Sequence, residues 1–174
     1  MSVYLLIAKA NNYAFTDWLE AVRRTHDGGV YPESWRVKSR KIEIGDEVYL
    51  LKQGDSPKGV VAHGWITRGS YNHFKNRDGS GGPSPRVDVN FDVVLGPTDE
   101  PLAWPLPNRG YDGKFRGPFS SGVRLADELV AEMARLWTQH VLHQARPSAK
   151  LMPSATGSRM LVSDCGDPGR GLSK

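Results

Sequence analysis

The chain has 174 residues, of which 39% are hydrophobic and 24% charged. This composition is typical of one globular domain that is long enough to bury a core. No apolar run reaches the ~18 residues that a membrane-spanning helix needs. The first residues, Met1–Ile7, lack the basic segment and cleavage site of a signal peptide and predict a strand. The single cysteine, Cys165, excludes an internal disulfide and fits a reducing cytoplasm, where we expect the protein.

The net charge of +4 is unevenly distributed along the chain. Residues after Gln144 carry +3, and residues 1–143 carry only +1. The main part of the chain is therefore not a globally basic nucleic-acid binder, and any nucleic-acid surface must be local. Pro, Gly and Ser without apolar periodicity predict that 144–174 is a disordered tail or linker behind a domain of residues 1–143.

The chain begins with a predicted buried strand, Val3–Ala8, followed by a short helix. Asp17 and Glu20 have the spacing of a capping box that opens this helix. Its inner face is expected to consist of Trp18, Leu19 and Val22.

Residues 30–34 contain Pro32 and are interpreted as a loop that ends at Trp35. If residues 35–41 are extended, Arg36, Lys38 and Arg40 share one face. Two interpretations remain open for these cations: a solvated edge strand, or a stripe that follows phosphates. Trp35 is likewise compatible with the core or with the wall of a pocket.

A hairpin is predicted between Gly45 and Tyr71, with strands at 48–51 and 59–67 joined by the turn residues 53–57. Gly59 and Gly64 would weaken the second strand unless a bulge forms there, or a ligand or another backbone approaches them closely. The hairpin is therefore a plausible pocket wall, with Trp65 expected in the core.

A polar loop at 72–85 and a strand at 86–95 follow. Alternation places Val87, Val89, Phe91 and Val93 on one face of this strand, opposite an exposed polar face of Asp88, Asn90 and Asp92. Residues 96–117 are irregular, with Trp104 and Tyr111 expected at the edge of the core.

The clearest helix spans about 126–142. Its apolar stripe at helical spacing consists of Leu125, Leu129, Val130, Met133, Leu136, Trp137 and Val141. His140 and His143 are expected at the surface near its end.

Catalytic motifs are missing from the sequence. It has no phosphate loop, nucleophile elbow or zinc-ligand spacing, and Cys165 lies in the tail. We therefore expect no catalytic residues, no metal and no cofactor.

Several motifs occur together in a recognisable order. They are Ser34–Trp35, Gly45–Gly54, Pro57–Gly64, Ser70–Tyr71, Val87–Asp92 and Ser120–Gly122. Over roughly residues 1–140 this order resembles the EVE-like domain of the PUA superfamily. It resembles most closely the N-terminal domain of HNH-type restriction endonucleases that attack DNA containing modified cytosine.

The resemblance implies an α+β fold, with a small twisted, barrel-like mixed sheet flanked by helices. It also implies a pocket for a base flipped out of duplex DNA. The implied base pocket consists of Ser34, Trp35, Gly64, Tyr71, Phe119, Ser120 and Ser121. Phe119 replaces the family's usual glutamine, so base-edge readout is expected to differ. The cations that flank this pocket in sequence, and are expected to contact phosphates, are Arg36, Lys38, Arg40, Lys58, Arg68, Lys75 and Arg77.

The expected function is therefore recognition of 5-methylcytosine or a derivative in double-stranded DNA, as the reader part of a modification-dependent restriction system. The nuclease half is absent, so a nuclease subunit or domain would be supplied elsewhere. Two alternatives stay open. One is a reader of modified RNA, and the other is a small ASCH-like RNA- or nucleotide-processing enzyme. The enzyme would need a clustered acid/base set.

Overall fold

The computed structural model describes residues 1–8, 15–54, 57–73, 83–103 and 120–144. Six strands and two helices lie within these residues. In chain order they are β1 (Val3–Ala8), α1 (Trp18–His26), β2 (Tyr31–Arg36), β3 (Glu47–Lys52), β4 (Gly59–His73), β5 (Ser84–Val94), β6 (Val123–Arg124) and α2 (Asp127–Gln144). The α+β class with a mixed sheet is confirmed. The predicted tail lies outside the described residues, except for Gln144.

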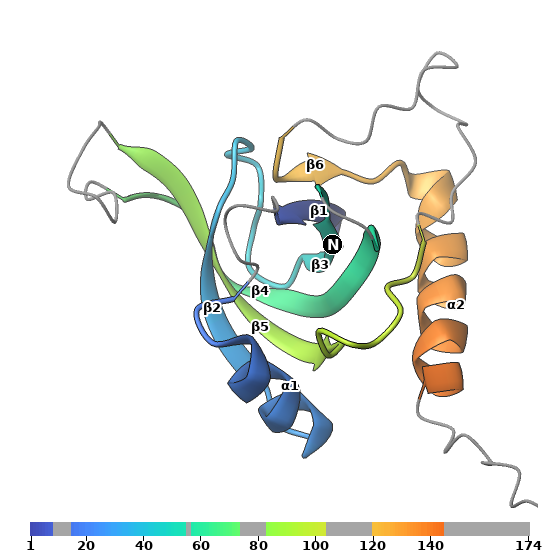
Figure 1. The fold of residues 1–174 in the computed structure, drawn as a ribbon. Coiled ribbons are helices and arrows are strands. Elements are labelled where there is room, and N and C mark those ends of the chain that lie inside the picture. Colours follow the sequence, from blue (N-terminus) through green and yellow to red (C-terminus); the bar gives the residue numbers. More distant parts are fainter. Residues whose placement is uncertain (9–14, 55–56, 74–82, 104–119, 145–174) are drawn as a thin grey trace, which may run out of the picture.

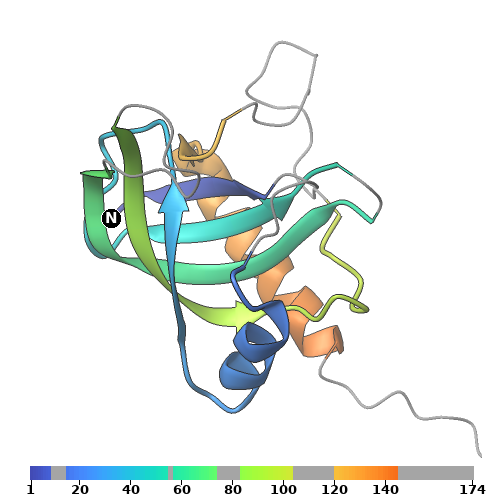
Figure 2. The ribbon, with the colours of Figure 1, turned by 60° about the vertical axis from the view of Figure 1, so that its left-hand side comes forward.

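The strands form one strongly curved sheet in the order β2-β5-β4-β3-β1-β6 (Figures 1 and 2). Within the described part of the chain, only β1 and β3 pair in parallel, and the other strand pairings are antiparallel. The edge strands β2 and β6 do not pair with each other among the described residues. The segments next to them do meet, because the Lys38 N–H donates to the Ser121 carbonyl at 3.0 Å.

The two faces of the sheet bury different clusters. We call the concave face, which carries Leu6, Leu50 and Phe91, the inner face, and the opposite one the outer face. Helix α1 packs its Trp18 and Val22 against the inner cluster. Helix α2 lies along the outer side of the sheet (Figure 1), where its apolar stripe joins outward side chains of β1 and β3.

Both predicted helices form, with one correction. The Asp17 carboxylate accepts the Glu20 N–H at 3.0 Å, which confirms the N-cap. The apolar stripe of α2 is buried or packed against the outer cluster, as predicted. Leu19, in contrast, is 69% exposed, because Trp18, Ala21 and Val22 form the face of α1 that turns towards the sheet.

The segment that was predicted to be a loop before Trp35 is strand β2. It pairs with β5 from Tyr31 opposite Phe91 to Arg36 opposite Arg86. Pro32 is tolerated because β2 is an edge strand, where one side of the backbone needs no ladder hydrogen bond. The strand ends at Arg36, so the extended run predicted to reach residue 41 is too long.

Strands β4 and β5 depart from simple alternation through bulges. Register shifts occur at His63/Gly64, Ile66/Arg68 and Arg68/Tyr71. Val94, and not the predicted Val93, joins the inner cluster. Trp65 was expected in the core, but it is 38% exposed on the outer face, because its neighbour Ile66 turns inward.

Candidate nucleic-acid interface

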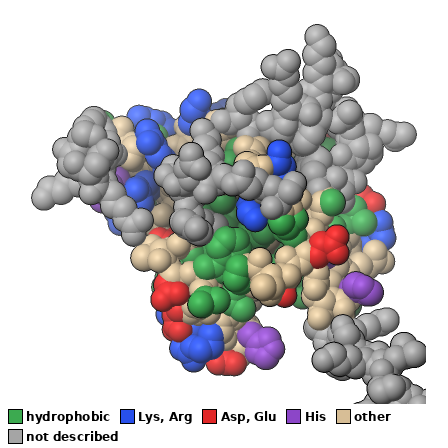
Figure 3. Space-filling model, in the orientation of Figure 1, with side chains coloured by type: hydrophobic (Ala, Val, Ile, Leu, Met, Phe, Trp, Pro, Cys, Tyr) green, Lys and Arg blue, Asp and Glu red, His purple; other side chains and the backbone are tan. Residues whose placement is uncertain are grey.

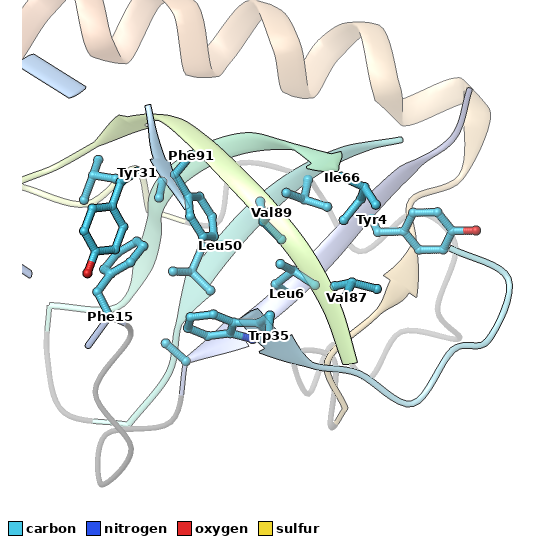
Figure 4. Close-up of a cluster of buried hydrophobic side chains, with 14 of the residues drawn as sticks. Tyr4, Leu6, Phe15, Tyr31, Trp35, Leu50, Ile66, Val87, Val89 and Phe91 are labelled. Atoms are coloured by element: carbon cyan, nitrogen blue, oxygen red, sulfur yellow. The ribbon is translucent and has the colours of Figure 1, made fainter. Parts of the chain in front are cut away.

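Trp35 lies on the inner face, within the aromatic part of the core. Its ring packs edge-to-face with Phe15 at 6.2 Å and with Phe91 at 6.3 Å between centroids (Figure 4). Only 9% of its surface is exposed. Of the two environments left open by the sequence, the structure places Trp35 in the core, so a ligand could reach no more than its edge.

Ser34 and Tyr71 lie on the other side of the sheet. The Ser34 hydroxyl is 3.0 Å from the Tyr71 hydroxyl, which donates to the Asp88 carboxylate at 2.7 Å. Partial burial, together with the Asp88 carboxylate, raises the pKa of Tyr71 above its ordinary value. Successive side chains of a strand point to opposite faces, so Ser34 and Trp35 cannot line one pocket.

Gly64 is buried between two strands. A Cβ atom at this position would lie 2.5 Å from the Asn90 carbonyl oxygen and 2.9 Å from the Phe91 Cα. The glycine therefore allows the backbones of β4 and β5 to approach at a bulge. Of the reasons for a glycine weighed from the sequence, a bulge and a close backbone approach both apply to Gly64.

Ser121 connects three segments that are distant in sequence. Its hydroxyl accepts the Ile7 N–H at 3.2 Å, and its carbonyl accepts the Lys38 N–H. Gly122 has φ = 87°, and a Cβ there would lie 3.1 Å from the Val37 Cβ. The strand that carries Trp35 thus continues directly into a contact with the serine-glycine segment. Ser120 is half-buried beside it, and Phe119 lies outside the described residues.

The predicted phosphate contacts are exposed wherever the structure describes them. Those side chains are Arg36, Lys38, Arg40, Lys58 and Arg68. Lys75 and Arg77 lie outside the described residues. Lys58 lies just before the first residue of β4, away from Arg68 in the second half of that strand. Figure 3 shows Lys and Arg side chains gathered on the side of the molecule from which β4 and β5 project.

A polar cluster on the outer face was not foreseen from the sequence. His63 on β4 contacts Asp92 on β5 through Nδ1 at 2.7 Å and Glu47 on β3 through Nε2 at 3.0 Å. The Tyr49 hydroxyl donates to the same Glu47 carboxylate at 2.6 Å. The alternation of Asp88, Asn90 and Asp92 was interpreted as an exposed face, yet Asp92 is half-buried against the imidazole. A histidine and a glutamate on two different strands are a signal for such a cluster only when the register of β3, β4 and β5 is known.

The cluster is better suited to holding strands together than to moving protons. Burial lowers the pKa of His63, but hydrogen bonds to Asp92 and Glu47 outweigh it and raise the value to about 9. A hydrogen bond from His63 lowers the pKa of Glu47, against the effect of its burial. His63 is therefore protonated at neutral pH, with both nitrogens engaged, and is no general base. No group of three or more metal-ligating side chains occurs within the described part of the chain.

Comparisons with known proteins give information about the fold alone. No protein-family model and no curated protein matches this chain. A crystal structure of a Pseudomonas syringae protein matches with a TM-score of 0.52 and 14% identity, over 78% of this chain and 99% of that one. A hypothetical protein from Leishmania major matches with a TM-score of 0.50 and 16% identity, over 83% of this chain and 97% of that one.

The helices of the described residues include none that is both long and apolar enough to span a membrane. At these identities, likeness in structure establishes the fold alone. The chain thus shares its mixed, helix-flanked sheet with the Pseudomonas and Leishmania proteins.

Proposed function

We propose that this protein is a DNA-binding module that recognises a modified base, 5-methylcytosine or a derivative, flipped out of the duplex. It would be the reader part of a cytoplasmic modification-dependent restriction system, with the nuclease supplied elsewhere. The fold we propose is the barrel-like arrangement of the PUA superfamily's EVE-like domains. The observation that carries the proposal is the contact between Lys38 and Ser121. It brings the basic segment, the Trp35 strand and the serine-glycine segment together.

The proposed interface has two parts. Arg36, Lys38 and Arg40 are exposed and would contact phosphates without reading sequence. The base would lie beside Ser120, Ser121 and the exposed edge of Trp35. Flipping a base costs a few kcal/mol. Because only the edge of Trp35 is accessible, polar contacts to the base and the phosphate contacts would supply most of the compensating affinity.

The remaining pocket residues take other roles in this proposal. Ser34 and Tyr71 stabilise the sheet from the outer face, and Gly64 lets two strands approach. The ASCH-like alternative needs an acid/base cluster with a free base, whereas both nitrogens of His63 are already engaged. A reader of modified RNA would use the same basic segment. A preference for RNA over duplex DNA of the same sequence would distinguish it from a DNA reader.

The test is a binding panel with one duplex sequence containing cytosine, 5-methylcytosine, 5-hydroxymethylcytosine or N6-methyladenine, and its RNA counterpart. The wild-type protein should bind one modified-cytosine duplex best. The triple variant Arg36→Ala/Lys38→Ala/Arg40→Ala should weaken modified and unmodified duplexes alike and reduce the salt dependence.

A matched control removes three charges elsewhere, through Arg23→Ala/Arg24→Ala/Arg135→Ala on the helices. It should leave duplex affinity near that of the wild type. Equal losses in both triple variants would show that net charge, and not the basic segment, carries binding. Equal affinity of the wild type for all duplexes would overturn the reader, and preference for RNA would favour the RNA alternative.

A further inference from the structure

Three arginines converge on the outer face of the sheet. Arg36 on β2 lies directly opposite Arg86 on β5, which in turn lies opposite Tyr71 on β4. Directly opposed side chains in antiparallel strands start only about 4.5–5.5 Å apart at their Cβ atoms. Arg68 belongs to the same group, because its guanidinium lies over the Tyr71 ring at 4.0 Å from the centroid.

The positive charge of this group is only partly compensated within the described residues, where Asp88 lies opposite Arg68 in the pairing of β4 with β5. None of the three arginines forms an ion pair there, whereas Arg23, Arg124 and Arg135 each pair with a carboxylate. The nearby carboxylate, Asp88, accepts the Tyr71 hydroxyl at 2.7 Å. Like charges directly opposite each other destabilise a sheet unless something neutralises them.

Arg86 supplies a second, independent observation. Its Nε–H is buried and has no hydrogen-bond partner among the described residues. One terminal nitrogen makes only long contacts of 3.4 Å, to the carbonyl and hydroxyl oxygens of Ser34. A buried donor on a charged group that lacks an acceptor is unfavourable, so the sheet supplies no strong partner for this guanidinium. An anion bound at its terminal nitrogens would compensate the charge.

We infer that Arg86, with Arg36 and Arg68, forms a binding site for one phosphate group on the outer face. Guanidinium groups match phosphate geometry through paired N–H donors, which a lysine ammonium cannot reproduce. The inference rests on the proposed function in that the phosphate belongs to the bound nucleic acid. It adds Arg86, which lies inside a strand and was not expected to contact a ligand.

The first experiment observes the arginine Nε–H signals by ¹⁵N–¹H NMR during titration with inorganic phosphate. The Arg86 signal should shift with phosphate but not with sodium chloride of equal ionic strength. The same signal should shift when a short unmodified duplex is added, which separates free phosphate from backbone phosphate as the ligand. An Arg86 signal that ignores both phosphate and duplex would overturn the site.

The second experiment measures duplex affinity for Arg86→Gln, with Arg135→Gln on α2 as the control. Loss of a charged hydrogen-bonding partner should weaken modified and unmodified duplexes about tenfold each. The salt slope should fall by about 1. Arg68→Gln, at an exposed position, should act in the same direction and serves if Arg86→Gln fails to fold.

The outcomes separate this inference from the proposed function. Preference for modified duplex, with unchanged affinity and salt slope in both Arg variants, overturns the outer-face site and leaves the reader intact. A phosphate-induced shift without any nucleic-acid binding overturns the reader and the backbone source, and leaves a site for free phosphate. A uniform loss in both variants, with the modified-base preference retained, supports both.

Discussion

The two faces of the curved sheet satisfy burial in different ways. On the inner face, Trp35, Leu50 and Phe91 pack as apolar side chains in one cluster. On the outer face, the apolar cluster under α2 is joined by half-buried polar side chains that pair across strands, as His63 does with Glu47 and Asp92. The difference shows that residues next to each other in sequence can belong to different contact networks on the two faces of one sheet.

Trp35 on the inner face and Trp65 on the outer face should differ most in their contribution to stability. Trp35→Ala should lower the free energy of unfolding by about 3–5 kcal/mol, because it empties a packed site between Phe15 and Phe91. Trp65→Ala, at a position 38% exposed on the outer face, should cost about 1 kcal/mol or less. Urea unfolding of both variants measures the difference. Similar losses would contradict the assignment of the two side chains to different environments.

The outer polar cluster predicts a particular pH dependence of stability. His63 has its pKa raised from 6.5 to about 9, so its contribution is complete below about pH 6.5 and is lost as pH rises through 9. This loss should amount to up to about 3 kcal/mol. The pKa of Glu47 is lowered from 4.5, so its contribution to stability is present above pH 4.5 and is lost as the pH falls below that value.

Unfolding measured from pH 5 to 9.5 tests this dependence. The wild type should lose stability between about pH 6.5 and 9, whereas His63→Gln should be less stable at pH 6 and nearly flat over that interval. A decline of equal size in both proteins would show that another group causes it. Inner-face variants such as Trp35→Phe should keep the wild-type slope.

Tyr71→Phe should produce a smaller effect than the loss of the His63 contribution. It removes the hydrogen bond to Asp88 and should cost about 1–2 kcal/mol, because the acceptor is a half-buried carboxylate. The comparison is Tyr4→Phe, whose hydroxyl donates to the neutral Lys41 carbonyl at 3.1 Å and should cost about 0.5–1 kcal/mol. Thermal unfolding of both variants measures the difference. A larger loss of stability for Tyr4→Phe than for Tyr71→Phe would argue against a strong hydrogen bond between Tyr71 and the Asp88 carboxylate.

Local patterns determined much of the secondary structure. The Asp17 cap and the α2 stripe depend on residues within one or a few turns, and both were predicted from spacing alone. The β3–β4 hairpin followed from its turn residues and apolar runs. The role of the exposed residues Arg36, Lys38 and Arg40 was open to two interpretations, and their exposure in the structure is compatible with both.

Contacts between distant segments decided the rest. Trp65 faces outward and Ser34 meets Tyr71 because bulges set the register of β4 on β5, and the sequence offered a bulge at Gly64 only as one of several explanations for the glycine. Pro32 indicated a loop, yet strand β2 forms there because it lies at the edge of the sheet, where proline is tolerated. The pairing of His63 with Glu47 and the convergence of Arg86 on Arg36 likewise depend on strand order. The sequence by itself determined both helices and strands β1, β3, β4 and β5, since propensity and periodicity are local, whereas the edge strands β2 and β6 form through their pairing with β5 and β1. Which side chains share a face was decided by tertiary structure, since one residue of register moves every side chain of a strand to the other side.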